Sequence, residues 1–216
     1  MSFSLNALLI LSIAISTAIA WIQRKKIDPS FIPFTRLLAT SLLSTIISAS
    51  ELNEGFSDAN NYNLFVPLQF LLITWQFQKW GLFRNKQWLY FALQGLCIVG
   101  YSLEQALTSP DRYYSYFILG HAIVIVLMSI SQANLLLASL SKNLARDPIF
   151  LICTGLVIYF TFMILVESFW IYGISKTQPF RNSIQEILTC IHILTNILFV
   201  FATIWIPLKP RYIMRS

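Results

Sequence analysis

The chain has 216 residues, of which 56% are hydrophobic and only 11% are Asp, Glu, Lys or Arg. A soluble domain carries roughly 25% charged residues, so this composition excludes an ordinary soluble domain. The net charge of +6 does not indicate nucleic-acid binding, because the basic residues lie in short segments between long apolar runs. A run of roughly 20 apolar residues can cross a bilayer as a helix. The sequence therefore predicts a membrane protein.

Seven apolar runs are predicted to form helices. In chain order they are residues 4–21, 34–52, 62–78, 88–108, 113–140, 149–172 and 184–206. The first run has no basic residue before it and is followed by Arg24, Lys25 and Lys26, which is the reverse of a cleaved signal peptide. We therefore expect this run to be retained. The fold class is predicted to be all-α, a single domain formed by a bundle of seven transmembrane helices.

Two helix starts carry local signals. Asp147 followed by Pro148 predicts an N-cap residue and a proline at the first position of the sixth helix. Ser183 and Glu186 have the spacing of a capping box, which favours a start of the seventh helix near residue 184. The three cysteines Cys97, Cys153 and Cys190 lie inside apolar runs, and their spacing indicates neither a disulfide framework nor a zinc motif.

The basic residues predict an orientation in the membrane. One side is predicted to carry eleven of them: Arg24, Lys25, Lys26, Lys79, Arg84, Lys86, Lys142, Arg146, Lys209, Arg211 and Arg215. The other side would carry three: Arg112, Lys176 and Arg181. Because the basic side usually faces the cytoplasm, we expect the N-terminus outside, the C-terminus in the cytoplasm, and a location in the cell inner membrane.

The last run carries a polar stripe. Gln185, Thr189, His192 and Asn196 follow one another at spacings of four, three and four, so they share one face of a helix. Counting roughly 1.5 Å per residue from the outer ends, Gln69, Tyr101, His121 and His192 lie at similar depth, with Glu104 and Glu167 nearer the outside. In lipid, such groups must face other helices or a polar cavity.

These positions define a candidate ligand-binding set. Its members are His192, His121, Asn196, Gln185, Gln69, Tyr101, Glu104 and Glu167. The alternative for each histidine is a hydrogen bond that holds neighbouring helices together, and Gln69 fits such a tie as well. For Glu104 and Glu167 the alternative is exposure at the outer headgroups. No catalytic or metal-binding residue is predicted.

Parts of the sequence resemble a known family. The stretches DPIFLICTGLVIYF (147–160), IHILTNILFVFATIW (191–205) and NNYNLF (60–65) are similar to a family of uncharacterised seven-helix integral membrane proteins of Bacteroidota-type bacteria. The resemblance implies the seven-helix architecture and the importance of His192, which is followed by Asn196 as in the family. It implies no activity. Asn63 and Gln69 stand where the family has a His and a Glu, which argues against a metal or proton role for that pair.

Several functions can be weighed against the residues. A retinal protein is excluded, because every lysine lies outside the predicted spans. A metal-dependent lipid hydrolase would need about three protein ligands for zinc, which two histidines and one glutamate could supply. A haem between His121 and His192, a transporter and a structural subunit stay open as alternatives.

The best prediction is a non-enzymatic sensor or binding module with an outward-facing polar pocket. Its partners would be the lipid bilayer and a small ligand or a membrane partner protein, and no cofactor and no nucleic acid are predicted.

Overall fold

The computed structural model describes residues 3–53, 58–109, 112–139, 144–172 and 177–207. These ranges contain seven long α-helices and no extended strand. The helices are α1 (Phe3–Gln23), α2 (Ile32–Asn53), α3 (Ala59–Lys79), α4 (Gln87–Leu107), α5 (Ser115–Ser139), α6 (Pro148–Ile171) and α7 (Gln178–Trp205). Short 3₁₀ segments, η1 (Pro29–Phe31) and η2 (Leu144–Arg146), precede α2 and α6. The prediction of seven helices is confirmed. The first six begin and end within three residues of the predicted ranges. Leu140, the predicted end of the fifth helix, lies outside the described residues.

Local chemistry explains where α6 begins. The Asp147 carboxylate accepts hydrogen bonds from the backbone nitrogens of Ile149, at 2.9 Å, and Phe150, at 3.0 Å. Pro148 occupies the first turn, where a missing N–H leaves no helical hydrogen bond unmade. The start predicted from Asp147 and Pro148 is confirmed.

The start of α7 differs from the prediction. α7 begins at Gln178, with Thr177 as its N-cap residue and Pro179 in its first turn. Ser183 and Glu186 therefore lie inside the helix, both exposed, and the predicted capping box is wrong. A proline fits the first turn of a helix better than any later turn, so Pro179 marks the start.

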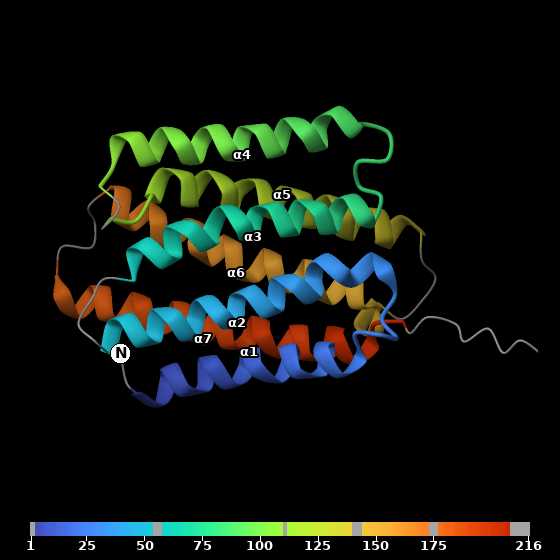
Figure 1. Cartoon of the computed structure of the whole chain (residues 1–216), viewed down its shortest axis with the longest axis horizontal. Helices are drawn as coiled ribbons and strands as arrows, with labels where there is room; N and C mark the ends of the chain where they lie inside the picture. Colours follow the sequence, from blue (N-terminus) through green and yellow to red (C-terminus); the bar gives the residue numbers. More distant parts are fainter. Residues whose placement is uncertain (1–2, 54–57, 110–111, 140–143, 173–176, 208–216) are drawn as a thin grey trace, which may run out of the picture.

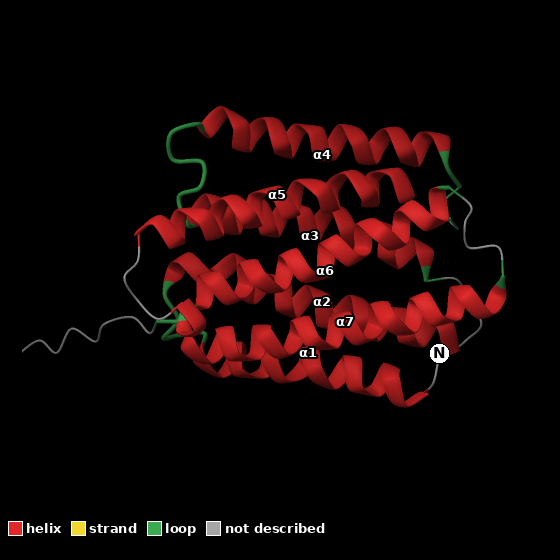
Figure 2. Cartoon of the chain, turned by 180° about the vertical axis from the view of Figure 1, so that it is seen from behind, coloured by secondary structure: helices red, strands yellow, loops and turns green. Residues whose placement is uncertain are grey.

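The helices form an antiparallel bundle in which α4 lies apart (Figure 1). α1, α2, α3, α5, α6 and α7 form a ring in which each helix packs against the next, and α7 returns to α1. α4 lies outside this ring and packs on α3 and α5. The view from behind shows the same arrangement, with α4 at the edge of the molecule (Figure 2).

Helix length and surface composition indicate association with a membrane. Four helical segments are long and apolar enough to cross one: Pro29–Glu51, Ser115–Ala138, Pro148–Ile171 and Pro179–Trp205. α1 contains a shorter apolar stretch, Ala7–Gln23. Large apolar side chains also cover the outer faces of the bundle; Leu8, Leu64, Leu127 and Leu165 are 49–59% exposed. Such an extensive apolar surface is unfavourable in water and suits contact with lipid.

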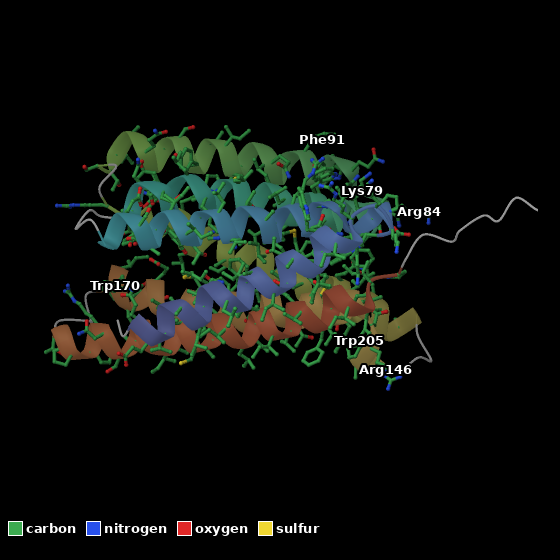
Figure 3. The ribbon with its side chains drawn as sticks, turned by 60° about the horizontal axis from the view of Figure 1, so that its bottom comes forward. Lys79, Arg84, Phe91, Arg146, Trp170 and Trp205 are labelled. Atoms are coloured by element: carbon green, nitrogen blue, oxygen red, sulfur yellow. The ribbon has the colours of Figure 1, made fainter. Side chains whose placement is uncertain are left out.

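The two ends of the bundle differ in charge. The end where α1 and α3 finish carries Arg24, Lys25, Lys26, Lys79, Arg84, Lys86 and Arg146, together with Asp28 and Asp147. The opposite end carries Arg112 and Arg181 among Glu51, Asp58, Glu104, Glu167 and Glu186. Figure 3 shows Lys79, Arg84 and Arg146 at the same end as Trp205, and Trp170 at the other end.

Candidate functional site

His121 lies about two turns into α5 and is enclosed by aromatic rings. The Phe117 ring stacks on the imidazole with ring centroids 5.8 Å apart. The rings of Phe160 and Phe70 meet it edge-on, with centroids at 5.6 and 6.4 Å. Only 5% of the residue is exposed. Rings from α3, α5 and α6 therefore hold the imidazole in one orientation.

The two ring nitrogens of His121 differ in their surroundings. Nδ1 lies 3.2 Å from the backbone carbonyl oxygen of Phe117. A carbonyl oxygen only accepts hydrogen bonds, so Nδ1 carries the proton and donates it, which in a neutral ring leaves Nε2 as an acceptor. Nε2 is buried and has no hydrogen-bond partner among the residues that the structure describes. Buried polar atoms normally have a partner, so this nitrogen is an unsatisfied acceptor that the surrounding side chains cover.

A cavity of about 550 Å³ lies beside His121, between α3, α4 and α5. Small-molecule sites span roughly 300–1,000 Å³, so the cavity has the size of such a site. Its walls are mostly aliphatic and aromatic, with Phe70 from α3, Leu93 and Leu96 from α4, and Phe117 and Val124 from α5. Polar groups are few, and the charged one is Glu104. The cavity is therefore suited to a mainly apolar molecule.

Small residues keep this space open. Cys97 and Gly100 of α4 and Gly120 of α5 all line the cavity. A Cβ added at Gly100 would lie 3.5 Å from Cδ2 of Phe117, which is ordinary contact, and one added at Gly120 would meet nothing within 4 Å. Larger side chains at these three positions would extend into the cavity. The volume thus results from small residues on the facing sides of α4 and α5.

Glu104 connects α4 to the start of α5 at one end of the cavity. Its carboxylate accepts hydrogen bonds from the backbone nitrogens of Tyr116, at 3.1 Å, and Phe117, at 2.5 Å. The first N–H groups of a helix have no partner within the helix, and the helix dipole favours a negative charge there. Glu104 therefore caps α5. Tyr101, one turn earlier, packs its ring on that of Phe117 at 5.9 Å.

His192 lies in a second and much smaller cavity. Its half-buried ring packs on the ring of Tyr159 with centroids 4.8 Å apart. Together with Gln69, Tyr159 and Asn196 it lines a space of about 30 Å³. This volume holds about one water-sized group. It does not hold a molecule of the size that fits beside His121.

The polar stripe of α7 is divided in the structure. Asn196 is buried, and its Nδ2 donates a hydrogen bond to Oγ of Ser12 at 3.0 Å, which ties α7 to α1. Thr189 is also buried, whereas Gln185 is exposed. Gln185 lies about two turns into α7, which begins at Gln178. The stripe therefore faces the bundle only from Thr189 onward.

The two histidines lie on different sides of an aromatic pair. The rings of Tyr159 and Phe160, adjacent in α6, are 5.1 Å apart. His192 packs on Tyr159, and His121 packs on Phe160. The large cavity brings together His121 and Glu104, with Tyr101 packed close by, and the small one brings together His192, Asn196 and Gln69. The predicted set does not form a single polar pocket.

Glu167 is buried in α6, about one turn before the helix ends. Ser115 lies within hydrogen-bonding reach of its carboxyl group, and Tyr62 and Tyr113 lie close enough to interact with it electrostatically. Its Oε2 atom has no partner within the described ranges. Glu104 is also near enough to repel it. In the same ranges, no three His, Cys, Asp or Glu side chains lie close enough together to hold a metal ion.

Sequence reasoning missed the residues that shape the large cavity. Phe117 and Phe160 enclose His121, and Cys97, Gly100 and Gly120 leave the space beside it. The glycines inside two apolar helices were the available signal, because a glycine there often marks space or close approach. The aromatic residues carried no such signal, since rings are common in any apolar helix.

Comparison with protein-family models, with curated proteins and with solved structures finds no match. The class of the protein therefore follows from the molecule itself. It is a membrane-associated helical bundle with a large, mostly apolar cavity between its outlying helix and the ring.

Proposed function

We propose that all seven helices cross the bacterial inner membrane, with the N-terminus outside and the C-terminus in the cytoplasm. The shortest of them, α1, α3 and α4, have 21 residues each. At 1.5 Å per residue this corresponds to roughly 31 Å, about the thickness of the hydrocarbon core. The concentration of Lys and Arg at one end of the bundle supports the orientation. Membership of the uncharacterised family that residues 147–160 and 191–205 resemble fits this architecture and stays a prediction.

We further propose that the chain is a non-enzymatic binding module that takes up a small apolar molecule from the bilayer. The observation that carries this function is the 550 Å³ cavity, with apolar walls and a buried His121. Because the cavity lies between α4 and the ring, a molecule can enter it from the lipid phase without crossing the packed core. The proposed binding site is therefore this apolar cavity and not the polar pocket predicted from the sequence. Of the residues in the predicted set, His121 and Glu104 line the cavity.

Binding in this cavity would change how α4 sits on the ring. α4 is held by Glu104, which caps α5, and by a hydrogen bond from Gln94 to Thr74 of α3. Its outer face carries large exposed apolar side chains that do not line the cavity, among them Phe91 and Ile98. A membrane partner protein that contacts this face would respond to the position of α4. Occupancy of the cavity would in this way be reported within the membrane.

The experiment compares cavity-filling and control variants. Gly120→Phe adds a ring at a position that lines the cavity, whereas Gly95→Phe adds the same ring on α4 at a position that does not line it. An added Cβ meets nothing within 4 Å at either position. Parent and variants are purified in mild detergent, and native mass spectrometry and organic extraction identify the small molecules that accompany each. We expect an apolar molecule with the parent and with Gly95→Phe that is lost from Gly120→Phe. The same content in all three samples, or none in any, would contradict the proposal.

A further inference from the structure

The large cavity is elongated along α4. Every turn of α4 from Leu93 to Thr108 contributes to its lining, so at 1.5 Å per residue the cavity extends over roughly 22 Å of the helix. Its volume of about 550 Å³ spread over this length corresponds to a mean cross-section of about 25 Å², which is a channel roughly 5 Å wide. Leu96, Leu103 and Leu107 line the channel and are 59–86% exposed. A molecule can therefore enter the channel sideways from the lipid.

The two ends of this channel differ in polarity. At the acidic end of the bundle, where α4 ends and α5 begins, the lining includes Glu104, Thr108 and Tyr116. At the inner end, the lining includes Phe70, Leu93 and Val124. His121 lies between these groups and offers no free polar atom, because Nδ1 is bonded to the Phe117 carbonyl and Nε2 is covered by its neighbours. The channel therefore suits an amphipathic molecule whose polar group lies at the acidic end.

A channel of this width takes a single alkyl chain. Carbon atoms in contact lie roughly 4 Å apart, so one chain fills the width, whereas two chains side by side or a fused ring system need more. An extended polypeptide advances about 1.2 Å per backbone bond and an extended alkyl chain is similar, so a palmitoyl chain reaches roughly 18 Å, close to the length of the channel. We infer that the cavity binds a phospholipid, with one acyl chain lying along α4 and the head group at the acidic end. This inference rests on the proposed function, since it names the class and the direction of the molecule that the cavity takes up.

Arg112 supplies a partner for the phosphate of the head group. The residue is exposed in the connection between α4 and α5. Its backbone N–H donates to the carbonyl oxygen of Ser109 at 3.0 Å, and its own carbonyl oxygen accepts from Nδ2 of Asn63 at 2.8 Å. These bonds hold the Arg112 backbone close to Thr108, at the polar end of the channel. Arginine binds phosphate through charge-assisted and often paired hydrogen bonds. The negative charge of Glu104 is partly offset by the two N–H groups of α5 that it caps.

Photoactivatable lipids measure the direction of the chain. The parent protein is purified in digitonin, whose fused rings are wider than the channel, and receives phosphatidylcholine with a diazirine either beside the carbonyl group or at the methyl end of its palmitoyl chain. After irradiation, peptide mass spectrometry locates the labelled residues. We expect the methyl-end probe to label Cys97, which is buried and lines the channel roughly 16 Å from Thr108. The carbonyl-end probe should label Thr108 and Tyr116 instead. Labelling of Cys97 by the carbonyl-end probe alone, or by both probes equally, would overturn the inference.

Two controls separate the channel from the outer surface. Leu43 of α2 is 59% exposed and, like Cys97, lies ten residues before the last residue of its helix, so it reports lipid that only surrounds the protein. Gly120→Phe should lose the label at Cys97 and keep the label at Leu43, whereas Gly95→Phe should keep both. A label at Leu43 without one at Cys97 in the parent, or a label at Cys97 that Gly120→Phe retains, would show that lipid does not occupy the channel. The comparison of the two probes on the parent does not depend on the folding of either variant.

The role of Arg112 is measured by titration. In Arg112→Gln, the concentration of the methyl-end probe that half-saturates the label at Cys97 should rise about fivefold, as expected for one basic residue beside a lipid head group. Arg181→Gln removes the same charge at the same end of the bundle, but on α7, and should leave this concentration unchanged. Equal half-saturation in the parent and in Arg112→Gln would overturn the pairing of Arg112 with the phosphate.

The failure of this inference differs from the failure of the proposed function. If native mass spectrometry finds an apolar molecule that Gly120→Phe loses, while neither photolipid labels Cys97, the cavity binds a molecule of another class and the phospholipid inference alone is wrong. If neither a bound molecule nor a label at Cys97 is found, the proposed function fails as well.

Discussion

At the scale of single residues, polar side chains in the helices divide into those with a protein partner and those without. Asn196 donates to Ser12, and Glu104 accepts from the first turn of α5. These bonds hold helices together, as polar groups in membrane proteins commonly do. The Nε2 atom of His121 has no such bond in the described ranges. The same holds for Oε1 of Gln132 and Oγ1 of Thr195, so a missing partner does not by itself mark a binding group.

The bond between Asn196 and Ser12 can be tested with a double-mutant cycle. Asn196→Ala and Ser12→Ala should each lower the free energy of unfolding, and the double variant should lower it by less than the sum. We expect a coupling energy of about 0.6 kcal/mol, typical of hydrogen bonds between membrane helices. The measurement is reversible unfolding in mixed detergent micelles. Strictly additive effects would show that the two side chains do not stabilise each other.

The same cycle separates the two roles considered for Asn196. As a helix tie it should leave the small apolar molecule bound in the large cavity unchanged, as measured by native mass spectrometry, because Asn196 lines the small cavity and not the large one. Loss of that molecule from Asn196→Ala, with folding intact, would contradict the division into two cavities.

At the scale of elements, the helices differ in how closely they pack. α6 and α7 approach closely at Gly155, where an added Cβ would lie 2.8 Å from Cε1 of Phe199 and 3.3 Å from Cγ2 of Thr195. Phe199 is itself held edge-on against Phe34 of α2, with ring centroids 5.4 Å apart. α4 has no such contact; its Gly95 faces open space and its Gly100 meets Phe117 only at ordinary distance. The ring is therefore tightly packed on the side of α6 and α7 and open on the side of α4.

We predict that Gly155→Ala destabilises the protein although alanine favours helices. Overpacking of a core costs about 1–3 kcal/mol, whereas the gain in helix propensity is about 1 kcal/mol. Gly95→Ala is the matched control, because it has the propensity gain without the clash, and its stability should be equal to that of the parent or higher. The melting temperature of the two detergent-solubilised variants checks this.

Phe199→Leu, added to Gly155→Ala, should recover part of the lost stability by removing the ring atom that the new methyl group meets. If Gly155→Ala is as stable as Gly95→Ala, α6 and α7 do not approach each other closely at Gly155.

At the scale of the whole molecule, charge and hydrophobicity are separated along the bundle. Apolar side chains cover its length, basic residues gather at one end, and acidic residues are more frequent at the other. This arrangement is typical of an integral membrane protein that follows the positive-inside rule. It also places Glu104 and the capped start of α5 toward the acidic end of the molecule.

The orientation can be measured with introduced cysteines. In a background without the three natural cysteines, Lys86→Cys probes the basic end and Ser109→Cys probes the acidic end; both positions are exposed. We expect a membrane-impermeant maleimide to label Ser109→Cys in intact spheroplasts and to label Lys86→Cys only after lysis. The reverse pattern would show that the basic end faces outward.

The sequence by itself determined the number of helices, their bounds to within a few residues for six of the seven, and the charges at their ends. These properties are local. Whether a run forms a helix depends on its own apolar length, and a start such as that of α6 depends on Asp147 and Pro148 directly beside it. The exception, α7, also has a local cause, because Pro179 sets its start ahead of Ser183.

Only the tertiary structure decided which polar groups have partners and where the cavity lies. Ser12 and Asn196 are distant in sequence, and the rings around His121 come from α3, α5 and α6. Periodicity assigns residues to a helix face but does not specify which helix that face meets. His121 and His192 therefore have similar predicted depth and yet line separate cavities, because Tyr159 and Phe160 lie between them and α4 packs outside the ring.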